Sequence, residues 1–78
     1  MFINKSIEGT NNICGKIVAQ KRAQMKISQQ KLCNLLQLAG LDIDKNAVQR
    51  IEAGKRFVTD IELVVLMNVL KFTIKDIV

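Results

Sequence analysis

The feature that most constrains this chain is the stretch at 28–56, in which two short helical patterns are separated by a loop. Ser28 is placed to cap the first pattern, because its hydroxyl can accept hydrogen bonds from N–H groups that a first helical turn leaves unpaired. Apolar residues then recur at helical spacing and give this helix a face to bury. They are Leu32, Leu35, Leu36 and, at the margin, Ala39. We therefore expect a helix over about 29–38.

The second helical pattern has its own start and stop signals. Asp44 is the expected N-cap, and Val48 and Ile51 lie three residues apart on the face to be buried. Gly54 should end the helix, since glycine enters the left-handed conformation without a Cβ clash. The helix expected over about 45–53 carries polar side chains on its other face, and basic residues follow it. They are Lys45, Asn46, Gln49 and Arg50, then Lys55 and Arg56. Such side chains can hydrogen-bond base edges, so the pattern predicts a DNA-reading helix-turn-helix.

The charge of the chain is concentrated around the same stretch. Among 78 residues, 12 are Lys or Arg and 7 are Asp or Glu, which gives a net charge of +5. Residues 16–56 hold nine of the basic and three of the acidic residues, whereas 57–78 hold two and three. A polyanionic partner would require this distribution, and a solvated basic surface is the alternative. Three Phe and no Tyr or Trp argue against recognition of single strands by base stacking.

An earlier helix is expected over about 12–25, with Asn11 or Asn12 as its cap. Its inner face should hold Cys14, Val18 and, less centrally, Ile17 and Met25. Gly15 costs a helix about 1 kcal/mol relative to Ala, which indicates close approach by another element. Residues 1–12 are expected to form a flexible arm and 13–78 the folded domain. An arm that reaches into a DNA groove is the alternative to a merely mobile terminus.

A fourth helix is expected over about 60–70, capped by Thr59 or Asp60, and it is apolar almost all round. Its core stripe should be Leu63, Leu66, Met67 and Leu70. The other apolar residues are candidates for exposure, and such a patch usually marks an interface. They are Ile61, Val64, Val65 and Val69. Thr73 should cap a last turn over 74–78, with Ile77 turned inward, so the expected fold is all-α, a compact bundle of five short helices.

Missing residue types argue against several classes of protein. Cys14 and Cys33 could pair, but no secretory signal is present and Cys33 lies on an apolar face, so reduced, buried thiols are expected. Without histidine, no metal site, cofactor or catalytic constellation is expected, and an enzyme is disfavoured. No apolar run approaches the ~20 residues of a membrane span. We therefore expect a cytosolic protein that is not an enzyme.

Several of these segments resemble the lambda-repressor-like (Cro/XRE) helix-turn-helix family, over residues 14–78. One segment is Ser28-Gln29-Gln30-Lys31-Leu32-Cys33, where the family has Thr-Gln-x-x-Leu-Ala. Another is Ile51-Glu52-Ala53-Gly54-Lys55-Arg56, where the family has Ile-Glu-x-Gly-Lys-Arg. The loop at 37–43 is longer than the family's usual turn, as in a longer-loop branch of the family. Lys71 stands where a glycine commonly ends the fourth helix.

The resemblance implies roles for individual positions. Base edges would be contacted by Lys45, Asn46 and Arg50, with Gln49 beside them. DNA phosphates would be contacted by Lys21, Gln29, Lys55 and Arg56. Arg22 and Glu52 would form an ion pair between the first and third helices, with a phosphate contact by Arg22 as the alternative.

These observations predict a sequence-specific, double-stranded DNA-binding regulator of transcription, expected to act as a repressor. A homodimer would place two copies of the 45–53 helix in successive major grooves of an inverted-repeat operator. The alternative is a protein-interaction module, such as an antitoxin or an adaptor. It would bind a protein partner through the apolar surface of the 60–70 helix, with DNA binding secondary.

Overall fold

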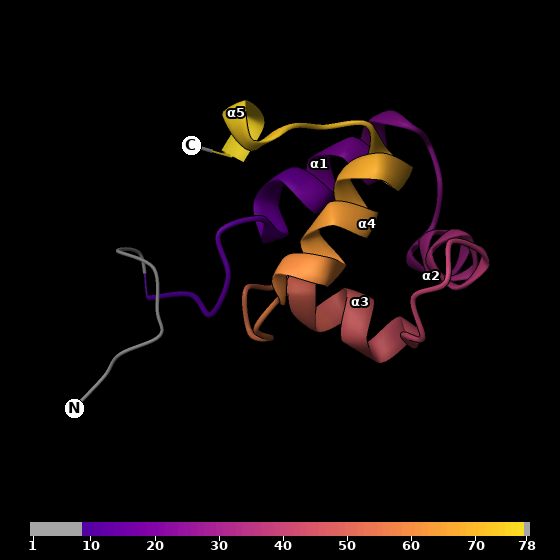
Figure 1. The fold of residues 1–78 in the computed structure, drawn as a ribbon, viewed down its shortest axis with the longest axis horizontal. Helices are drawn as coiled ribbons and strands as arrows, with labels where there is room; N and C mark the ends of the chain where they lie inside the picture. Colours follow the sequence, from indigo (N-terminus) through magenta and orange to yellow (C-terminus); the bar gives the residue numbers. More distant parts are fainter. Residues whose placement is uncertain (1–8, 78) are drawn as a thin grey trace.

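The computed structural model describes residues 9–77, which form five α-helices and no strand. The helices are α1 (Gly15–Gln24), α2 (Gln29–Leu38), α3 (Lys45–Glu52), α4 (Asp60–Leu70) and α5 (Ile74–Ile77). Both α1 and α2 pack against α3 on one side and against α4 on another (Figure 1). The all-α prediction with five short helices is therefore confirmed. None of the helices within this range has the length and apolarity that a membrane crossing requires.

The starts of α2, α3 and α4 follow the expected capping residues. The Ser28 hydroxyl accepts a hydrogen bond from the Lys31 N–H at 3.0 Å, and the Asp44 carboxylate accepts one from the Ala47 N–H at 2.7 Å. Thr59, rather than Asp60, caps α4. Each cap satisfies an N–H group that the helix cannot satisfy itself. Local chemistry thus sets three of the helix starts.

α1 is shorter than the pattern predicts. It begins at Gly15 rather than near residue 12, although the side-chain Oδ1 atom of Asn12 accepts a hydrogen bond from the Gly15 N–H at 2.7 Å. Met25 lies beyond the end of α1 and is exposed, so its assignment to the inner face was wrong. The close approach expected at Gly15 is confirmed, because a Cβ added there would overlap the backbone carbonyl oxygen of Ile51.

The core draws on α1 to α4 and on the segments between and after them. Its buried apolar residues are Cys14, Val18, Leu32, Cys33, Leu36, Ile43, Val48, Ile51, Leu66, Leu70 and Phe72. Both cysteines are buried free thiols, as predicted, and burial raises the pKa of Cys14. Ala39, the marginal member of the α2 stripe, is exposed.

The long loop between α2 and α3 is held by its own apolar residues and by side chains of α2. Ile43 is buried and Leu41 packs against the core, as their alternation with acidic residues predicts. The backbone carbonyl of Ile43 accepts hydrogen bonds from the Gln37 side-chain amide at 2.9 Å and from the Cys33 thiol at 3.2 Å. The extra length therefore forms a closed turn, which keeps the start of α3 close to α2.

α4 ends at Leu70, and Lys71 caps it in the left-handed conformation (φ 60°) that glycine commonly provides. The chain reverses there and places Phe72 in the core. The N–H of Phe72 bonds the Met67 carbonyl at 3.2 Å, which satisfies one acceptor of the last helical turn. α5 follows, and its Ile77 packs against the core as expected.

Candidate functional site

α3 buries one side and exposes the other. Val48 and Ile51 are each only 1% exposed. At about 100° per residue, four exposed polar residues lie opposite them on the helix. These residues, the polar face of α3, are Lys45, Asn46, Gln49 and Arg50. Their side chains form no hydrogen bond or ion pair with any other described residue.

An ion pair fixes the last turn of α3. Arg22 of α1 holds the Glu52 carboxylate with two N–H groups, Nε to Oε2 at 2.7 Å and Nη2 to Oε1 at 3.1 Å. The Arg22 Nη1 group also donates to the Ile27 carbonyl at 2.9 Å, and the Glu52 hydrogen bond raises the pKa of Arg22. The Arg22 and Glu52 side chains are 22% and 8% exposed. The ion pair implied by the resemblance is thus present and mostly buried.

Gln29 joins this cluster from the start of α2. Its side-chain amide donates to Glu52 Oε1 at 3.0 Å, so one carboxylate connects three helices. The phosphate contact implied for Gln29 would therefore have to use an N–H group that Glu52 does not occupy. The observed bond attaches the Gln29 side chain to Glu52, the last residue of α3.

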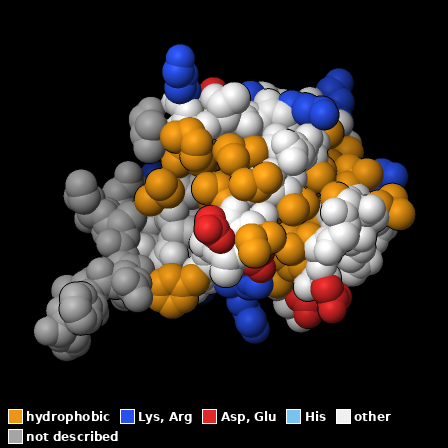
Figure 2. Space-filling model, in the orientation of Figure 1, with side chains coloured by type: hydrophobic (Ala, Val, Ile, Leu, Met, Phe, Trp, Pro, Cys, Tyr) orange, Lys and Arg blue, Asp and Glu red, His pale blue; other side chains and the backbone are white. Residues whose placement is uncertain are grey.

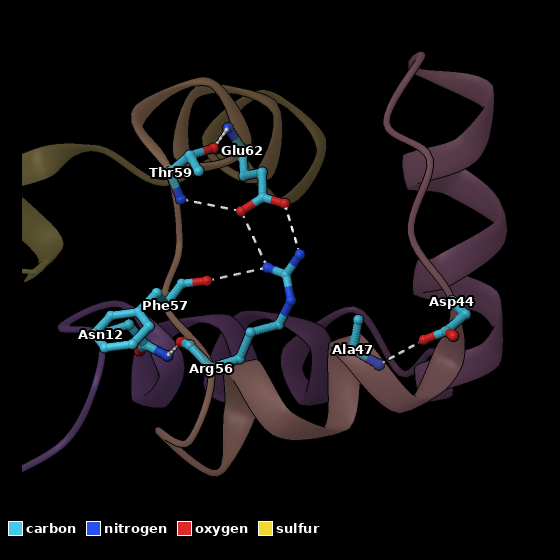
Figure 3. A network of polar contacts seen from close by, with 7 residues as sticks. All are labelled: Asn12, Asp44, Ala47, Arg56, Phe57, Thr59 and Glu62. Atoms are coloured by element: carbon cyan, nitrogen blue, oxygen red, sulfur yellow. Dashed lines mark hydrogen bonds and ion pairs between the residues drawn. The ribbon is translucent and has the colours of Figure 1, made fainter.

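A second ion pair links the segment after α3 to the start of α4. Arg56 donates from Nη1 and Nη2 to the two carboxylate oxygens of Glu62, at 3.0 and 2.8 Å, and Nη1 also donates to the Phe57 carbonyl at 3.1 Å (Figure 3). Glu62 in turn accepts from the Thr59 N–H at 3.0 Å and completes a capping box. The Arg56 hydrogen bonds lower the pKa of Glu62. Arg56 therefore faces α4, whereas the resemblance implied that it would contact phosphate.

The two lysines implied to contact phosphate lie in different surroundings. Lys55 is exposed just after α3, and its backbone N–H bonds the Arg50 carbonyl at 2.9 Å. Lys21 is half-buried in the last turn of α1. Lys55 is thus attached directly to the polar face of α3, and Lys21 belongs to a neighbouring helix.

The exposure expected along α4 is found at two of four positions. Ile61 and Val64 are 71% and 51% exposed, and we refer to them as the apolar face of α4. Val65 and Val69 are half-buried and pack against the core, so their assignment to the surface was wrong. Figure 2, drawn in the orientation of Figure 1, shows other apolar side chains on the face of the molecule that includes α4 and α5. Phe57 and Ile74 are exposed as well.

Sequence reasoning missed two contributors to the site. Glu62, the partner of Arg56, could have been found from the Thr59-x-x-Glu62 spacing, which is the capping-box signature. Asn12 donates to backbone carbonyls at the end of α3, which lies 39 or more residues away in the sequence. No local pattern signals a contact of that range.

Within residues 9–77, no three His, Cys, Asp or Glu side chains are grouped so that they could hold a metal ion. The same part of the chain presents two distinct surfaces, the polar face of α3 and the apolar face of α4. The chain matches no protein-family model, no curated protein and no solved structure.

Proposed function

We propose that this protein is a sequence-specific, double-stranded DNA-binding regulator of transcription, and that it acts as a repressor. In this proposal α2 and α3 form a helix-turn-helix of the lambda-repressor-like kind, and α3 enters the major groove. The observation that carries the proposal is the polar face of α3, whose four side chains are exposed and unpaired among the described residues. Arg50 can pair with guanine through two hydrogen bonds, and Asn46 or Gln49 with adenine.

The contacts that hold α3 in place favour sequence-specific recognition of bases over non-specific electrostatic attraction. Base contacts need side chains that start from a fixed backbone. α3 is fixed on its inner side by Val48 and Ile51, and at its last turn by the bonds from Arg22 and Gln29 to Glu52. A rigid helix can therefore present its outer side chains in one register.

Phosphate contacts are assigned to Lys55 and Lys21, while Arg56 and Gln29 are assigned to the support of α3 and α4. Lys55 follows directly after the reading helix, and a contact there would fix its position on the duplex without reading sequence. The net charge of +5 adds a favourable electrostatic term. Each phosphate contact should steepen the fall of affinity with salt.

We propose that the active form is a homodimer joined through the apolar face of α4. Ile61 and Val64 would be covered by the partner, which removes exposed apolar surface from water. Two copies of α3 would then meet half-sites roughly 34–36 Å apart on an inverted repeat. Occupation of such a site within a promoter would block transcription.

A selection from a random duplex library tests this function without knowledge of the operator. The proposal predicts that the wild-type protein enriches one motif with inverted-repeat symmetry. Unlabelled duplex of scrambled sequence should compete poorly for the enriched duplex. Retention of all sequences to the same extent, with binding that disappears on addition of salt, would contradict sequence reading and leave only charge attraction.

The second candidate is a protein-interaction module of the antitoxin or adaptor kind, and the exposure of Ile61 and Val64 favours it. It predicts that a protein co-purifies with the wild-type chain and with Arg50→Ala, but not with Ile61→Asp. The DNA-binding proposal predicts that Arg50→Ala removes the sequence preference. A chain that enriches no duplex motif and keeps such a partner in the Arg50→Ala variant would favour the second candidate.

A further inference from the structure

We infer that Asn11 and Asn12 are positioning residues for the DNA-reading surface. They belong to residues 10–12, here called the clamp, which lie against the end of α3 and the turn that carries Lys55. The inference rests on the DNA-binding function proposed above and adds a group of residues that does not itself touch DNA.

Asn12 joins three backbone segments through one side-chain amide. Its Nδ2 group donates to the Ile51 carbonyl at 3.1 Å and to the Arg56 carbonyl at 2.8 Å (Figure 3 shows the second bond). Its Oδ1 atom accepts from the Gly15 N–H at 2.7 Å. Both N–H groups of the amide are thus occupied within the protein. Asn12 can influence DNA only through the elements that it holds.

Asn11 holds the turn between the two carbonyls that Asn12 reaches. Its backbone N–H bonds the Gly54 carbonyl at 2.8 Å, and its Nδ2 group bonds the Lys55 carbonyl at 2.9 Å. Thr10 lies over Gly54, where an added Cβ would come within 2.8 Å of the Thr10 Cγ2 atom. The Thr10 hydroxyl also donates to the Asn12 carbonyl at 2.7 Å, which keeps the clamp compact.

The clamp supplies hydrogen-bond donors to backbone carbonyls in the last turn of α3 and in the segment that follows it. The last carbonyls of a helix lack partners of their own, and they carry the negative end of its dipole. Here the carbonyl of Ile51 in the last turn of α3, which also accepts from the Gly54 N–H, accepts a hydrogen bond from Asn12. The carbonyls of Gly54, Lys55 and Arg56, which follow α3, accept from Asn11 or Asn12 as well. The start of α1 also lies against this end, because Gly15 leaves no room for a Cβ beside the Ile51 carbonyl. Opposite ends of two helix dipoles therefore meet at the clamp.

Hydrogen bonds therefore hold the Lys55 backbone at both its N–H group and its carbonyl group. Its N–H bonds the Arg50 carbonyl at 2.9 Å, and its own carbonyl accepts from Asn11. The proposed phosphate contact by Lys55 and the proposed base contact by Arg50 thus share one rigid backbone segment. Paired hydrogen bonds to a base edge need the side chain held within about 0.5 Å of the productive geometry, which requires a fixed backbone. Release of the clamp should therefore weaken reading more than it weakens charge attraction.

The test compares Asn12→Asp with Asn34→Asp, each of which lowers the net charge by one. Aspartate at position 12 keeps an acceptor for the Gly15 N–H but loses both donors to the end of α3. Asn34 is an exposed α2 residue whose Oδ1 atom accepts from the Gln30 side chain, a bond that aspartate keeps, and it serves as the matched control. Asn11→Ala, which removes one donor and keeps the backbone bond to Gly54, is the milder variant if Asn12→Asp does not fold. Each protein is titrated with the duplex enriched by the wild-type chain and with a scrambled duplex of the same composition.

The quantity that decides is the ratio of the two affinities. We expect Asn12→Asp to lower this ratio at least about tenfold, the value of roughly one good base contact, and Asn34→Asp to leave it unchanged. A merely destabilised protein would bind both duplexes more weakly and keep the ratio. An equal ratio for Asn12→Asp and Asn34→Asp would overturn the inference while the proposed function stands.

Hydrogen exchange of the DNA-free protein gives an independent readout. Asn12→Asp should speed exchange of the Gly54 and Lys55 amides, which bond Ile51 and Arg50, and leave the α2 amides protected. If the wild-type chain enriches no duplex, the proposed function fails, and exchange alone decides whether the clamp positions this turn. Unchanged exchange at Gly54 and Lys55 would then overturn the inference.

Discussion

The exposed faces of α3 and α4 show how differently two neighbouring helices end up at a surface. The polar face of α3 consists of four side chains that all point away from the core, over two nearly fully buried residues. α4 carries apolar residues on every side, and only Ile61 and Val64 stay strongly exposed. A helix with a sharp division of polar and apolar residues has one way to pack. A uniformly apolar helix has several, and its neighbours decide among them.

The largest effect should follow from loss of the support beneath α3. Glu52→Ala leaves the mostly buried Arg22 without its partner and should destabilise the protein by about 3–5 kcal/mol. Glu62→Ala, at the more exposed pair with Arg56, should cost clearly less. Chemical denaturation of both variants checks the order. An equal or larger loss for Glu62→Ala would show that the Arg56–Glu62 pair stabilises the fold at least as much as the Arg22–Glu52 pair.

Gly15→Ala should be the next largest change. The new Cβ would overlap the Ile51 carbonyl, and overpacking of this kind costs about 1–3 kcal/mol, which exceeds the gain of about 1 kcal/mol in helix propensity. Gly40→Ala is the control, because no atom lies within 4 Å of its added Cβ and only its φ of +95° opposes the change. Thermal unfolding should show a loss for both variants, from overlap at Gly15 and from the positive φ at Gly40, which costs about 1–2 kcal/mol once a Cβ is present. A stabilised Gly15→Ala protein would mean that α1 can move away from α3 at little cost.

Two substitutions on α4 separate its surface from its inner side. Val65→Ser removes a side chain that packs against the core and should lower stability by about 1–2 kcal/mol. Ile61→Ser should change the stability of the monomer by no more than about 0.5 kcal/mol, since this side chain is mostly exposed. Sedimentation should nevertheless show that Ile61→Ser weakens the proposed dimer. A wild-type protein that stays monomeric at all accessible concentrations would contradict the proposed dimer.

The smallest effect is a pH dependence that belongs to the start of α4. Because Arg56 lowers the pKa of Glu62, the folded state binds this proton less readily than the unfolded state. The stabilisation is complete above the ordinary glutamate pKa of about 4.3 and is lost as the pH falls toward the lower folded value. The unfolding midpoint of the wild-type protein should therefore drop more steeply below about pH 4.3 than that of Glu62→Gln. Parallel curves for the two proteins would show that the pair contributes nothing measurable.

The sequence predicts this fold well wherever a local rule is sufficient. Ser28 and Asp44 cap the helices that follow them, and Gly54 adopts the left-handed conformation at the end of α3. Each of these features depends on a few adjacent residues and on backbone chemistry. The polar face of α3 follows from the same kind of local pattern, because burial of Val48 and Ile51 turns the opposite side outward.

Features that depend on distant segments were predicted less well. Arg56 belongs to a basic run and was assigned to phosphate, but its guanidinium turns to Glu62 across the connection to α4. Residues 9–12 were assigned to the flexible arm, yet Asn11 and Asn12 bond the end of α3, and residues 1–8 of that arm lie outside the described part of the chain. The sequence also does not determine which side of α4 packs against the core, since apolar residues lie all around this helix. Long-range contacts decide all three.

The most direct test of the central claim, that the polar face of α3 reads DNA sequence, compares Arg50→Ala with Lys75→Ala. Each removes one positive charge from an exposed helical residue, and Lys75 lies on α5. We predict that Arg50→Ala weakens binding to the enriched duplex by about 1–3 kcal/mol and relaxes the preference at one base position. Lys75→Ala should keep both, and both variants should unfold at the wild-type temperature. Equal losses for the two variants, with no change in base preference, would contradict the claim.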